Sequence, residues 1–477
     1  MQRFRFYCAL YLGKLASFAC RLVSRSRGTN LPGAIALKID PQLLRHFGEL
    51  DPDKVVFITG TNGKSTTTNL LAHIFRTAGL NTVANLEGAN LLAGVAVTLL
   101  RNADLAGNLR ADYVLLETDE RFLPLIHAQL PARHLCVTNI QKDQVQRNGE
   151  PDIIYRKIRE AIDRDTTLYL NNDEPNAKSL ARFVDHAVFY GVAPHEKSFH
   201  KDDDPYAVTM PCPICSAPLR FSAYNIDNIG PFSCPGCGFS SASAADGKGK
   251  EKDGCVPDYL AEAVDFAKNS FRVSGVGYSF RYATPYFLYC YIAALAVARE
   301  FGVDGATVER AFQSFVNVGG RMEDIQVGGK TIHYLRMKQE NPETVQSALN
   351  VIAADPRQKI FLLGLDELVD FHPHYTNTFY AYDCDFRGLI ASGVSRYICF
   401  SGTVAYDAAL RLRYDGAPAE QISVLPTNDN AAILAELAHY AGEEVYLITW
   451  LKKYESLAAY VKKHAAMTAV AKGGATQ

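Results

Sequence analysis

The chain has 477 residues, of which 48% are hydrophobic and 21% are charged, a composition typical of a globular protein with about three domains. This composition excludes overall disorder, a collagen-like chain and a coiled-coil rod. The 49 basic and 51 acidic side chains leave a net charge of −2, so the whole chain has no electrostatic attraction for nucleic acid or for an anionic membrane.

The first segment mixes aromatic and aliphatic residues with basic ones. Its apolar stretch is interrupted by Lys14 and ends at Arg21, so it is shorter than the roughly 20 apolar residues that span a bilayer. No small-x-small cleavage site follows, which argues against a signal peptide. The pattern predicts an amphipathic helix that packs on the body of the protein or touches a membrane surface.

After residue 50, short apolar runs alternate with helical patterns. The pattern predicts strands within residues 54–60, 111–120, 132–140 and 166–175. The run after the first of these strands has apolar residues at helical spacing. Strands alternating with helices indicate an α/β fold with a doubly wound, mostly parallel sheet.

Residues 59–66 read Thr-Gly-Thr-Asn-Gly-Lys-Ser-Thr, between a predicted strand and a predicted helix. Two glycines allow a tight turn that aims backbone N–H groups at phosphate, and the helix N-terminus adds partial positive charge. Lys64 is expected to reach the β- and γ-phosphates, and the Ser65 hydroxyl to ligate Mg²⁺. Ile58 stands where the strict G-x-x-x-x-G-K-S form has its first glycine. The predicted nucleotide loop consists of Gly60, Thr61, Asn62, Gly63, Lys64, Ser65 and Thr66.

Four of the eleven cysteines form two C-x-x-C pairs separated by 18 residues, inside a Pro-, Cys- and Gly-rich module at 205–240. Two such knuckles hold Zn²⁺ tetrahedrally through thiolates, and with no open position the zinc is expected to be structural. The module has few basic residues, so nucleic-acid binding is not expected. The seven scattered cysteines indicate a reducing compartment. The predicted zinc ligands are Cys212, Cys215, Cys234 and Cys237.

A polar linker at 241–256 precedes two helical patterns, one from Pro285 to Gly302 and the next ending near Gly320. A third region begins near Lys330 and repeats the α/β pattern. Its predicted strands are 359–366, 395–402 and 444–450. Its predicted helices are 343–354, 403–414 and 430–441.

The motifs resemble those of the Mur ligase family, ATP-dependent enzymes that join carboxylates to amines in peptidoglycan precursors. Glu117-Thr118-Asp119-Glu120, at a predicted strand end, resembles the family's acidic Mg²⁺ site, with Glu117 as the ligand. Arg321 lies in a run similar to the G-R-x-E motif, whose arginine contacts nucleotide. Further matching segments are residues 60–66, 85–94, 138–150 and 172–174.

The four-cysteine ribbon narrows the resemblance to the MurT family, the synthetase subunits of lipid II isoglutaminyl synthase. Residues 31–44, 380–386 and 401–414 are similar to other parts of that family. The resemblance covers nearly the whole chain. It implies an N-terminal segment (1–50), a Mur ligase central domain with inserted ribbon and linker (51–328), and a C-terminal α/β domain (329–477).

The resemblance implies ATP-dependent amidation of the D-glutamate α-carboxylate of lipid II through an acyl phosphate. ATP, Mg²⁺ and structural Zn²⁺ are the implied cofactors. Ammonia would come from a GatD-type glutaminase subunit, whose catalytic triad is completed by an acid of the C-terminal domain. Asp370 is the first candidate for that acid and Asp366 the second. Lys64, Glu117 and Asp370 are the predicted catalytic residues.

A lipid-linked substrate implies a cytoplasmic protein that works at the inner face of the membrane, with the basic N-terminal segment available for docking. The chain departs from the family pattern in 283–296, 335–346 and 363–386. Two alternatives therefore stay open: a divergent carboxylate–amine ligase with another substrate, and a nucleotide-binding paralogue without catalysis.

Overall fold

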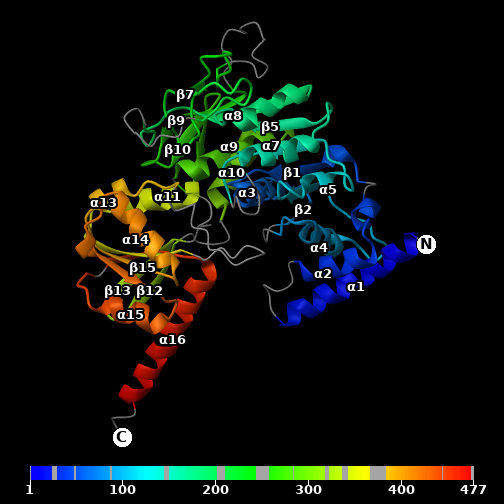
Figure 1. Cartoon of the computed structure of the whole chain (residues 1–477). Helices are drawn as coiled ribbons and strands as arrows, with labels where there is room; N and C mark the ends of the chain where they lie inside the picture. Colours follow the sequence, from blue (N-terminus) through cyan, green and yellow to red (C-terminus); the bar gives the residue numbers. More distant parts are fainter. Residues whose placement is uncertain are drawn as a thin grey trace. The chain divides into compact units, whose positions relative to one another are not determined.

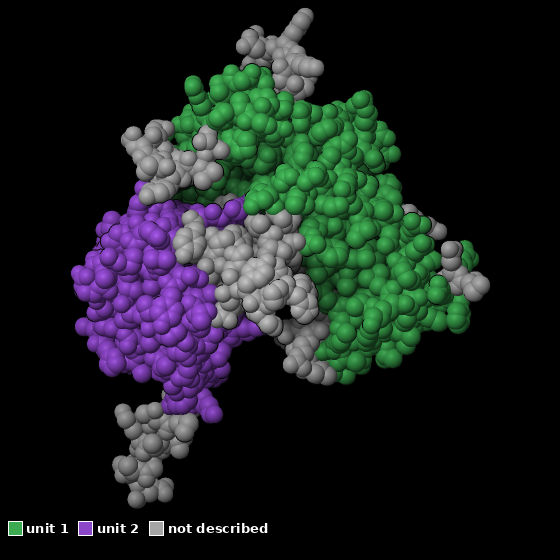
Figure 2. Space-filling model, viewed as in Figure 1, with its two compact units in different colours: residues 1–141, 148–317 green, residues 142–147, 318–477 purple. Residues whose placement is uncertain are grey.

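The computed structural model describes residues 2–23, 30–47, 50–85, 89–143, 150–200, 210–242, 257–282, 284–316, 322–335, 342–365, 383–442 and 444–473. The chain forms two compact units, coloured separately in Figure 2. Unit 1 comprises residues 1–141 and 148–317, and unit 2 comprises residues 142–147 and 318–477.

Unit 1 is built on a nine-stranded sheet among its described residues, with the order β11-β10-β9-β6-β5-β4-β1-β3-β2. Neighbouring strands from β2 to β9 run parallel, whereas β9, β10 and β11 form an antiparallel extension. The strands are β1 (Val55–Thr59), β2 (Thr82–Ala84), β3 (Tyr113–Glu117), β4 (His134–Val137), β5 (Thr167–Asn171), β6 (His186–Val192), β9 (Tyr259–Asp265), β10 (Ser270–Val273) and β11 (Val276–Ser279).

This sheet is covered on both faces, as the continuous apolar runs predict. Every residue of β1 is buried. Val56 and Ile58 belong to the core packed by α3, α9 and α10, while Val55 and Phe57 belong to the core on the other face. The predicted doubly wound α/β fold is thus confirmed. The helices are α3 (Lys64–Thr77), α4 (Leu92–Asn102), α5 (Leu123–His127), α7 (Pro151–Glu160), α8 (Pro175–Ser179), α9 (Pro285–Glu300) and α10 (Gly305–Ser314).

The N-terminal segment belongs to unit 1 and does not stand apart as its own domain. Helix α1 (Gln2–Val23) runs along α2 (Leu31–Ile39) and α4 (Figure 1). Gly13 permits this close packing, because a Cβ there would lie 2.8 Å from Cδ1 of Leu100. None of the helices in the described ranges has the length and apolar character that crossing a membrane requires.

The cysteine-rich module is inserted between β6 and β9, two strands that are neighbours in the sheet. It holds a two-stranded ribbon of β7 (Arg220–Phe221) and β8 (Phe232–Ser233). Its small core includes Leu219, Phe232 and Phe239 together with two of the cysteines. Such a core is too small to stabilise a module alone, which is consistent with the predicted metal.

Unit 2 has a six-stranded sheet in its described part, with the order β12-β13-β17-β14-β15-β16. Alternate residues of β14 belong to two hydrophobic cores. Phe361 and Leu363 belong to one core, and Ile360 and Leu362 belong to the other. The strands are β12 (Met322–Val327), β13 (Lys330–Leu335), β14 (Lys359–Gly364), β15 (Val394–Phe400), β16 (Ile422–Leu425) and β17 (Glu444–Ile448). The helices are α11 (Pro342–Ala353), α13 (Arg387–Ala391), α14 (Val404–Tyr414), α15 (Asn430–Ala438) and α16 (Leu451–Gly473).

The start of unit 2 differs from the expected boundary at residues 328 and 329. Strand β12 pairs antiparallel with β13 from Met322↔Leu335 to Val327↔Lys330, so residues 322–327 form the edge of the unit 2 sheet.

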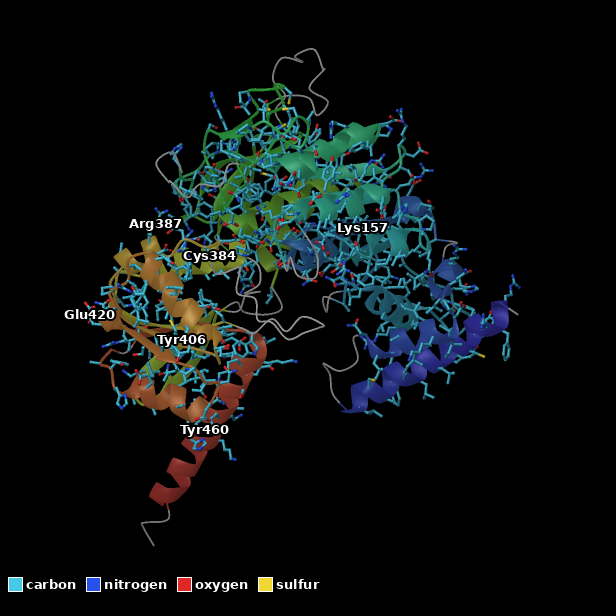
Figure 3. All side chains as sticks on the ribbon, in the orientation of Figure 1. Lys157, Cys384, Arg387, Tyr406, Glu420 and Tyr460 are labelled. Carbon is cyan, nitrogen blue, oxygen red and sulfur yellow. The ribbon has the colours of Figure 1, made fainter. Side chains whose placement is uncertain are left out.

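Cys384, labelled in Figure 3, is buried in this unit and donates from Sγ to the Pro342 carbonyl at 3.4 Å. Its thiol is therefore part of the hydrophobic core of unit 2.

A network of charged side chains connects the neighbouring strands β12, β13 and β17 of unit 2. His333 places Nδ1 2.8 Å from Asp324 Oδ1 and Nε2 2.7 Å from Glu444 Oε2. Glu444 also pairs with Arg357. Burial alone lowers the pKa of His333, but hydrogen bonds to the two carboxylates outweigh it and the pKa is raised. The imidazolium is therefore more stable in the folded protein than in the unfolded chain.

We predict that H333Q lowers the free energy of unfolding by about 1 kcal/mol near pH 6 and by less at pH 9. Because the folded pKa is raised, this stabilisation is complete below the unfolded pKa and is lost as pH rises through the folded pKa. Urea unfolding at both pH values measures it. H439Q is the control, since that side chain is 71% exposed. An equal loss from H333Q at both pH values would contradict the prediction.

Candidate functional site

The nucleotide loop lies where β1 ends and α3 begins, at the carboxyl edge of the parallel sheet. Gly60 and Gly63 have φ of +122° and +84°, values that favour glycine. A Cβ at Gly60 would lie 2.4 Å from Oγ1 of Thr138, so the turn has no room for a side chain. Gly63 is the N-cap of α3 and supplies no side-chain cap. The first turn of α3 can therefore present its N–H groups to an anion.

A second loop, after β4, braces this turn. The Asn62 N–H donates to Asn139 Oδ1 at 2.9 Å, and Asn139 Nδ2 donates back to the Asn62 carbonyl at 3.0 Å. Thr138 Oγ1 donates to that same carbonyl at 2.6 Å. The Gln141 N–H donates to Thr61 Oγ1 at 2.9 Å. These bonds fix the loop conformation before any ligand arrives, which lowers the entropic cost of binding.

Lys64 lies inside the loop and is almost fully buried. Its Nζ donates to the carbonyls of Gly60 and Thr61 and lies 2.6 Å from Oε1 of Glu120, a residue that is also buried. Burial, the largest influence, raises the pKa of Glu120, while the positive charge of Lys64 opposes that shift. Glu120 thus holds the ammonium in the position from which it can turn to phosphate.

Glu117 is buried at the end of β3, beside β1 in the register Ile58↔Glu117. Asn85 exchanges two hydrogen bonds with its backbone, at 2.7 and 2.8 Å. Asn90 Nδ2 donates to Glu117 Oε1 at 2.9 Å. The carboxylate is thereby oriented at the same sheet edge as the loop. Ser65, the second residue of α3, is exposed.

Two further acids follow β5. Asp173 accepts from the Val192 N–H at 2.7 Å and from the Tyr289 hydroxyl at 2.8 Å, and burial raises its pKa to about 6. Glu174 caps α8 and also accepts from the Ile140 N–H at 3.2 Å, and burial raises its pKa to about 7. Both acids organise backbone around the site.

A small pocket adjoins the nucleotide loop on its α9 side. The Cys290 Sγ would lie 3.2 Å from a Cβ at Gly63, so α9 packs directly on the loop. Among the described residues, the buried hydroxyl of Thr67, which lines this pocket, has no hydrogen-bond partner, and this suits a polar ligand. The pocket lining includes Asn62, Gly63, Thr67, Thr138, Asn139, Tyr190, Tyr286, Tyr289 and Cys290.

The structure places Gly60, Thr61, Asn62, Gly63, Lys64 and Glu117 at one sheet edge. Arg321, Asp366 and Asp370 lie outside the described residues. Glu120, the partner of Lys64, was not singled out from the sequence, although it stands in the acidic run. The sequence did contain a signal for it: Glu120 follows Glu117 by three residues, just after a predicted strand that ends beside the nucleotide loop.

The four predicted zinc ligands converge. All their Sγ atoms lie within 4.8 Å of one another, with Cys212 and Cys237 at 3.7 Å and Cys215 and Cys234 at 3.4 Å. A tetrahedron with Zn–S bonds of about 2.3 Å has S···S edges of about 3.8 Å. The donor set therefore fits Zn²⁺.

Both knuckles form the same turn. The N–H of Ser216 donates to the carbonyl of Cys212 at 2.9 Å, and the N–H of Gly238 to that of Cys234 at 3.0 Å. Each donor residue has a positive φ, +62° and +76°. Burial, the largest influence, raises the pKa of the Cys212 thiol, and the Ile214 N–H, which donates to its Sγ at 3.4 Å, opposes that shift. The backbone is therefore shaped to present all four sulfur atoms.

Comparison with known families gives two matches. The Mur ligase middle domain matches residues 58–213, and the MurT ligase C-terminal domain matches residues 339–452. The first match contains the nucleotide loop and the acidic run, and the second covers most of unit 2.

Two curated relatives align over almost the whole chain. Both are the lipid II isoglutaminyl synthase (glutamine-hydrolyzing) subunit MurT. The Staphylococcus aureus (strain COL) protein is 28% identical over 456 residues, covering 95% of this chain and 96% of the relative. The Streptococcus pneumoniae (strain ATCC BAA-255 / R6) protein is 27% identical over 450 residues, covering 92% and 93%.

Solved structures share the fold at low identity. A pseudomurein peptide ligase type C from Methanothermus fervidus has a TM-score of 0.59 at 18% identity, covering 87% of this chain and 79% of that one. The MurF ligase from Thermotoga maritima in complex with ADP has a TM-score of 0.55 at 14% identity, covering 90% and 85%. With a Mur ligase middle domain, a MurT ligase C-terminal domain and MurT relatives that align over almost its whole length, the chain is a MurT-like protein with the Mur ligase fold and is an ATP-dependent ligase.

Proposed function

We propose that the chain is the synthetase subunit that amidates the D-glutamate α-carboxylate of lipid II, giving D-isoglutamine. One observation carries this proposal: a pre-formed nucleotide loop with a buried, acid-held lysine occurs in a chain that aligns over 95% of its length with a lipid II isoglutaminyl synthase subunit. The lipid-linked substrate would be met at the inner face of the membrane, by a protein in the cytoplasm.

Lys64 supplies the positive charge that phosphoryl transfer requires. In the proposed complex its ammonium leaves Glu120 for the β- and γ-phosphate oxygens, while the first turn of α3 donates N–H groups to the same phosphates. Ser65 and Glu117 would hold Mg²⁺. That ion neutralises charge on the phosphates during transfer. Arg321 is proposed to contact the nucleotide as well.

The reaction then proceeds in two steps. A carboxylate oxygen of D-glutamate attacks the γ-phosphorus, the bond to the β-phosphate oxygen breaks, and an acyl phosphate and ADP form. The nitrogen of ammonia attacks the acyl carbon, the C–O bond to phosphate breaks, and the amide, inorganic phosphate and a proton are released. Activation turns a poor electrophile into a reactive one.

A separate GatD-type glutaminase is the proposed source of ammonia. The names of the two curated relatives describe a subunit of a glutamine-hydrolysing synthase, which supports a second component here. Asp370 is proposed to complete the partner's catalytic triad, by orienting a histidine and stabilising its charged form.

A second candidate is a carboxylate–amine ligase with a different substrate. The observation that favours it is the α9 side of the pocket, where Tyr286, Tyr289 and Cys290 lie in a segment that departs from the family pattern. Tyr289 is held by Asp173 and Asn225, so this lining is ordered and shapes what binds beside the loop. Such a ligase would need no glutaminase.

We predict that K64M weakens Mg–ATP binding by at least about tenfold, because a charge-assisted hydrogen bond to phosphate contributes roughly 1.5–3 kcal/mol. Isothermal titration calorimetry measures it. K157M, at an exposed lysine labelled in Figure 3, is the control. K64M/E120Q removes the unpaired buried acid, so a fold defect in K64M would be relieved while the binding loss stays. Wild-type affinity in folded K64M would contradict the role of Lys64.

We predict that the chain, purified with a GatD-type glutaminase, amidates lipid II with either glutamine or ammonia as nitrogen donor. D370N is expected to abolish the glutamine-dependent rate and to keep the ammonia-dependent rate, because only the partner triad loses its acid. D366N tests the second candidate for the same acid: loss of the glutamine-dependent rate in D366N, and not in D370N, would assign the triad acid to Asp366. Mass spectrometry of the stem peptide detects the amide.

The other outcomes of this assay discriminate between the functions. Product with an amino acid, and none with ammonia, would support the second candidate. Nucleotide binding without any product would indicate a non-catalytic paralogue. A D370N enzyme with full glutamine-dependent activity would contradict the role of Asp370.

We propose that the four-cysteine site holds one structural Zn²⁺ per chain. C215S and C237S are expected to lose the zinc and to lower the melting temperature, because the module has little core of its own. Metal analysis by mass spectrometry and thermal melts provide the measurement. C20S is the control, since that thiol lies on α1. Wild-type protein without zinc, or C215S with full zinc content, would contradict the proposal.

A further inference from the structure

Helix α1 has two apolar faces, and only one of them is buried in unit 1. Phe6, Ala9 and Leu10 are buried against α2, α4 and their surroundings. The opposite face is exposed, with Phe4 at 75%, Phe18 at 63% and Leu22 at 74% exposure. The exposed large apolar residues of α1 are Phe4, Tyr7, Tyr11, Leu12, Leu15, Phe18 and Leu22.

Six of these residues form one continuous stripe. Positions 4, 7, 11, 15, 18 and 22 recur at steps of three or four, the spacing of a single helix face. At 1.5 Å per residue the stripe is about 27 Å long. The Tyr11 hydroxyl donates to the carbonyl of Leu105, whose side chain is 69% exposed and adds to the patch. A surface helix normally turns polar residues to this side, so the stripe needs an occupant.

The charge pattern of α1 identifies that occupant. The helix contains four basic residues and no acidic one, in a chain whose net charge is −2. Arg3 and Arg5 are exposed beside the first residue of the stripe. Positions 3, 14 and 21 lie on one side of the helix, next to the stripe. Position 14 follows position 3 by 11 residues, about three turns, and position 21 follows it by 18 residues, about five turns. Lys14 on that side donates to the Ala103 carbonyl at 2.5 Å and so also fastens α1 to unit 1.

We propose that α1 docks the protein on an anionic bilayer surface, lying parallel to the membrane with the Phe4–Leu22 stripe in the headgroup region. An interfacial helix combines an apolar face that enters this region with basic residues that attract anionic lipid. Tyr7 and Tyr11 suit the boundary, because each has an apolar ring and a polar hydroxyl. A partner protein could cover the apolar stripe without any positive charge beside it, so the basic residues of α1 favour an anionic membrane over a protein as the partner. Within the proposed function, this docking brings the ligase to the surface that carries its substrate.

Sedimentation of the full chain with vesicles tests the proposal. Vesicles of phosphatidylglycerol and phosphatidylcholine are expected to bind the wild type at least ten times more strongly than phosphatidylcholine alone, and high salt should weaken that binding. L15E/F18E is expected to reduce binding at least tenfold with an unchanged melting temperature. R3E/R5E should remove the preference for anionic lipid. F4S/L22S replaces L15E/F18E if that variant fails to fold.

The matched control is Y406E/Y414E, which places two charges at exposed positions of α14 in unit 2. Tyr406 is labelled in Figure 3. This control variant should bind vesicles as the wild type does. No vesicle binding by the wild type, or equal binding by L15E/F18E, would overturn the proposal. So would a wild-type dimer, without lipid affinity, that L15E/F18E converts to monomer, because the stripe would then join two copies of the chain.

Discussion

A lysine ammonium and a glutamate carboxylate, buried side by side, set the properties of the nucleotide loop. Taking two charges out of water is costly, and their attraction together with further hydrogen bonds offsets that cost. Here Lys64 finds Glu120 and two carbonyls of its own loop, all within the fold. The same arrangement suits exchange, because a triphosphate offers the ammonium more negative charge than one carboxylate. The loop therefore binds an internal acid in place of a phosphate.

That exchange depends on a backbone that does not move. Gly60 has no room for a Cβ beside Thr138, and Asn62 is held from both sides by Asn139. Glu117 is oriented in turn by Asn85 and Asn90 from the segment after β2. Parallel strands bring these segments to one edge, since their carboxyl ends coincide. Distant parts of the chain thus converge on one small volume.

Much of this was predictable from local patterns. The strands β1, β3, β4 and β5 follow from apolar runs, and the loop and the C-x-x-C knuckles follow from residue spacing. The β9–β11 extension was not predicted, because β9 has no regular alternation of buried and exposed residues, and β10 and β11 have only four residues each. The edge strand β12 was assigned to the central domain, since its pairing with β13 follows from hydrogen bonding across a short turn.

Contacts between distant residues were harder to predict than elements. The acidic run at the end of β3 contains three carboxylates, and only the fold determines that Glu120 contacts Lys64 while Glu117 contacts Asn90. The two-sided character of α1 was hidden for a similar reason, because the sequence does not say which apolar face is covered. Burial in the folded chain distinguishes the faces.

Nucleotide binding at this loop requires Lys64 to exchange Glu120 for phosphate. A crystal structure of the full chain with Mg²⁺ and a non-hydrolysable ATP analogue tests it most directly. We expect Lys64 Nζ within about 3 Å of a β- or γ-phosphate oxygen, with its 2.6 Å contact to Glu120 lost. Nucleotide bound at full occupancy with Lys64 still paired to Glu120 would contradict it.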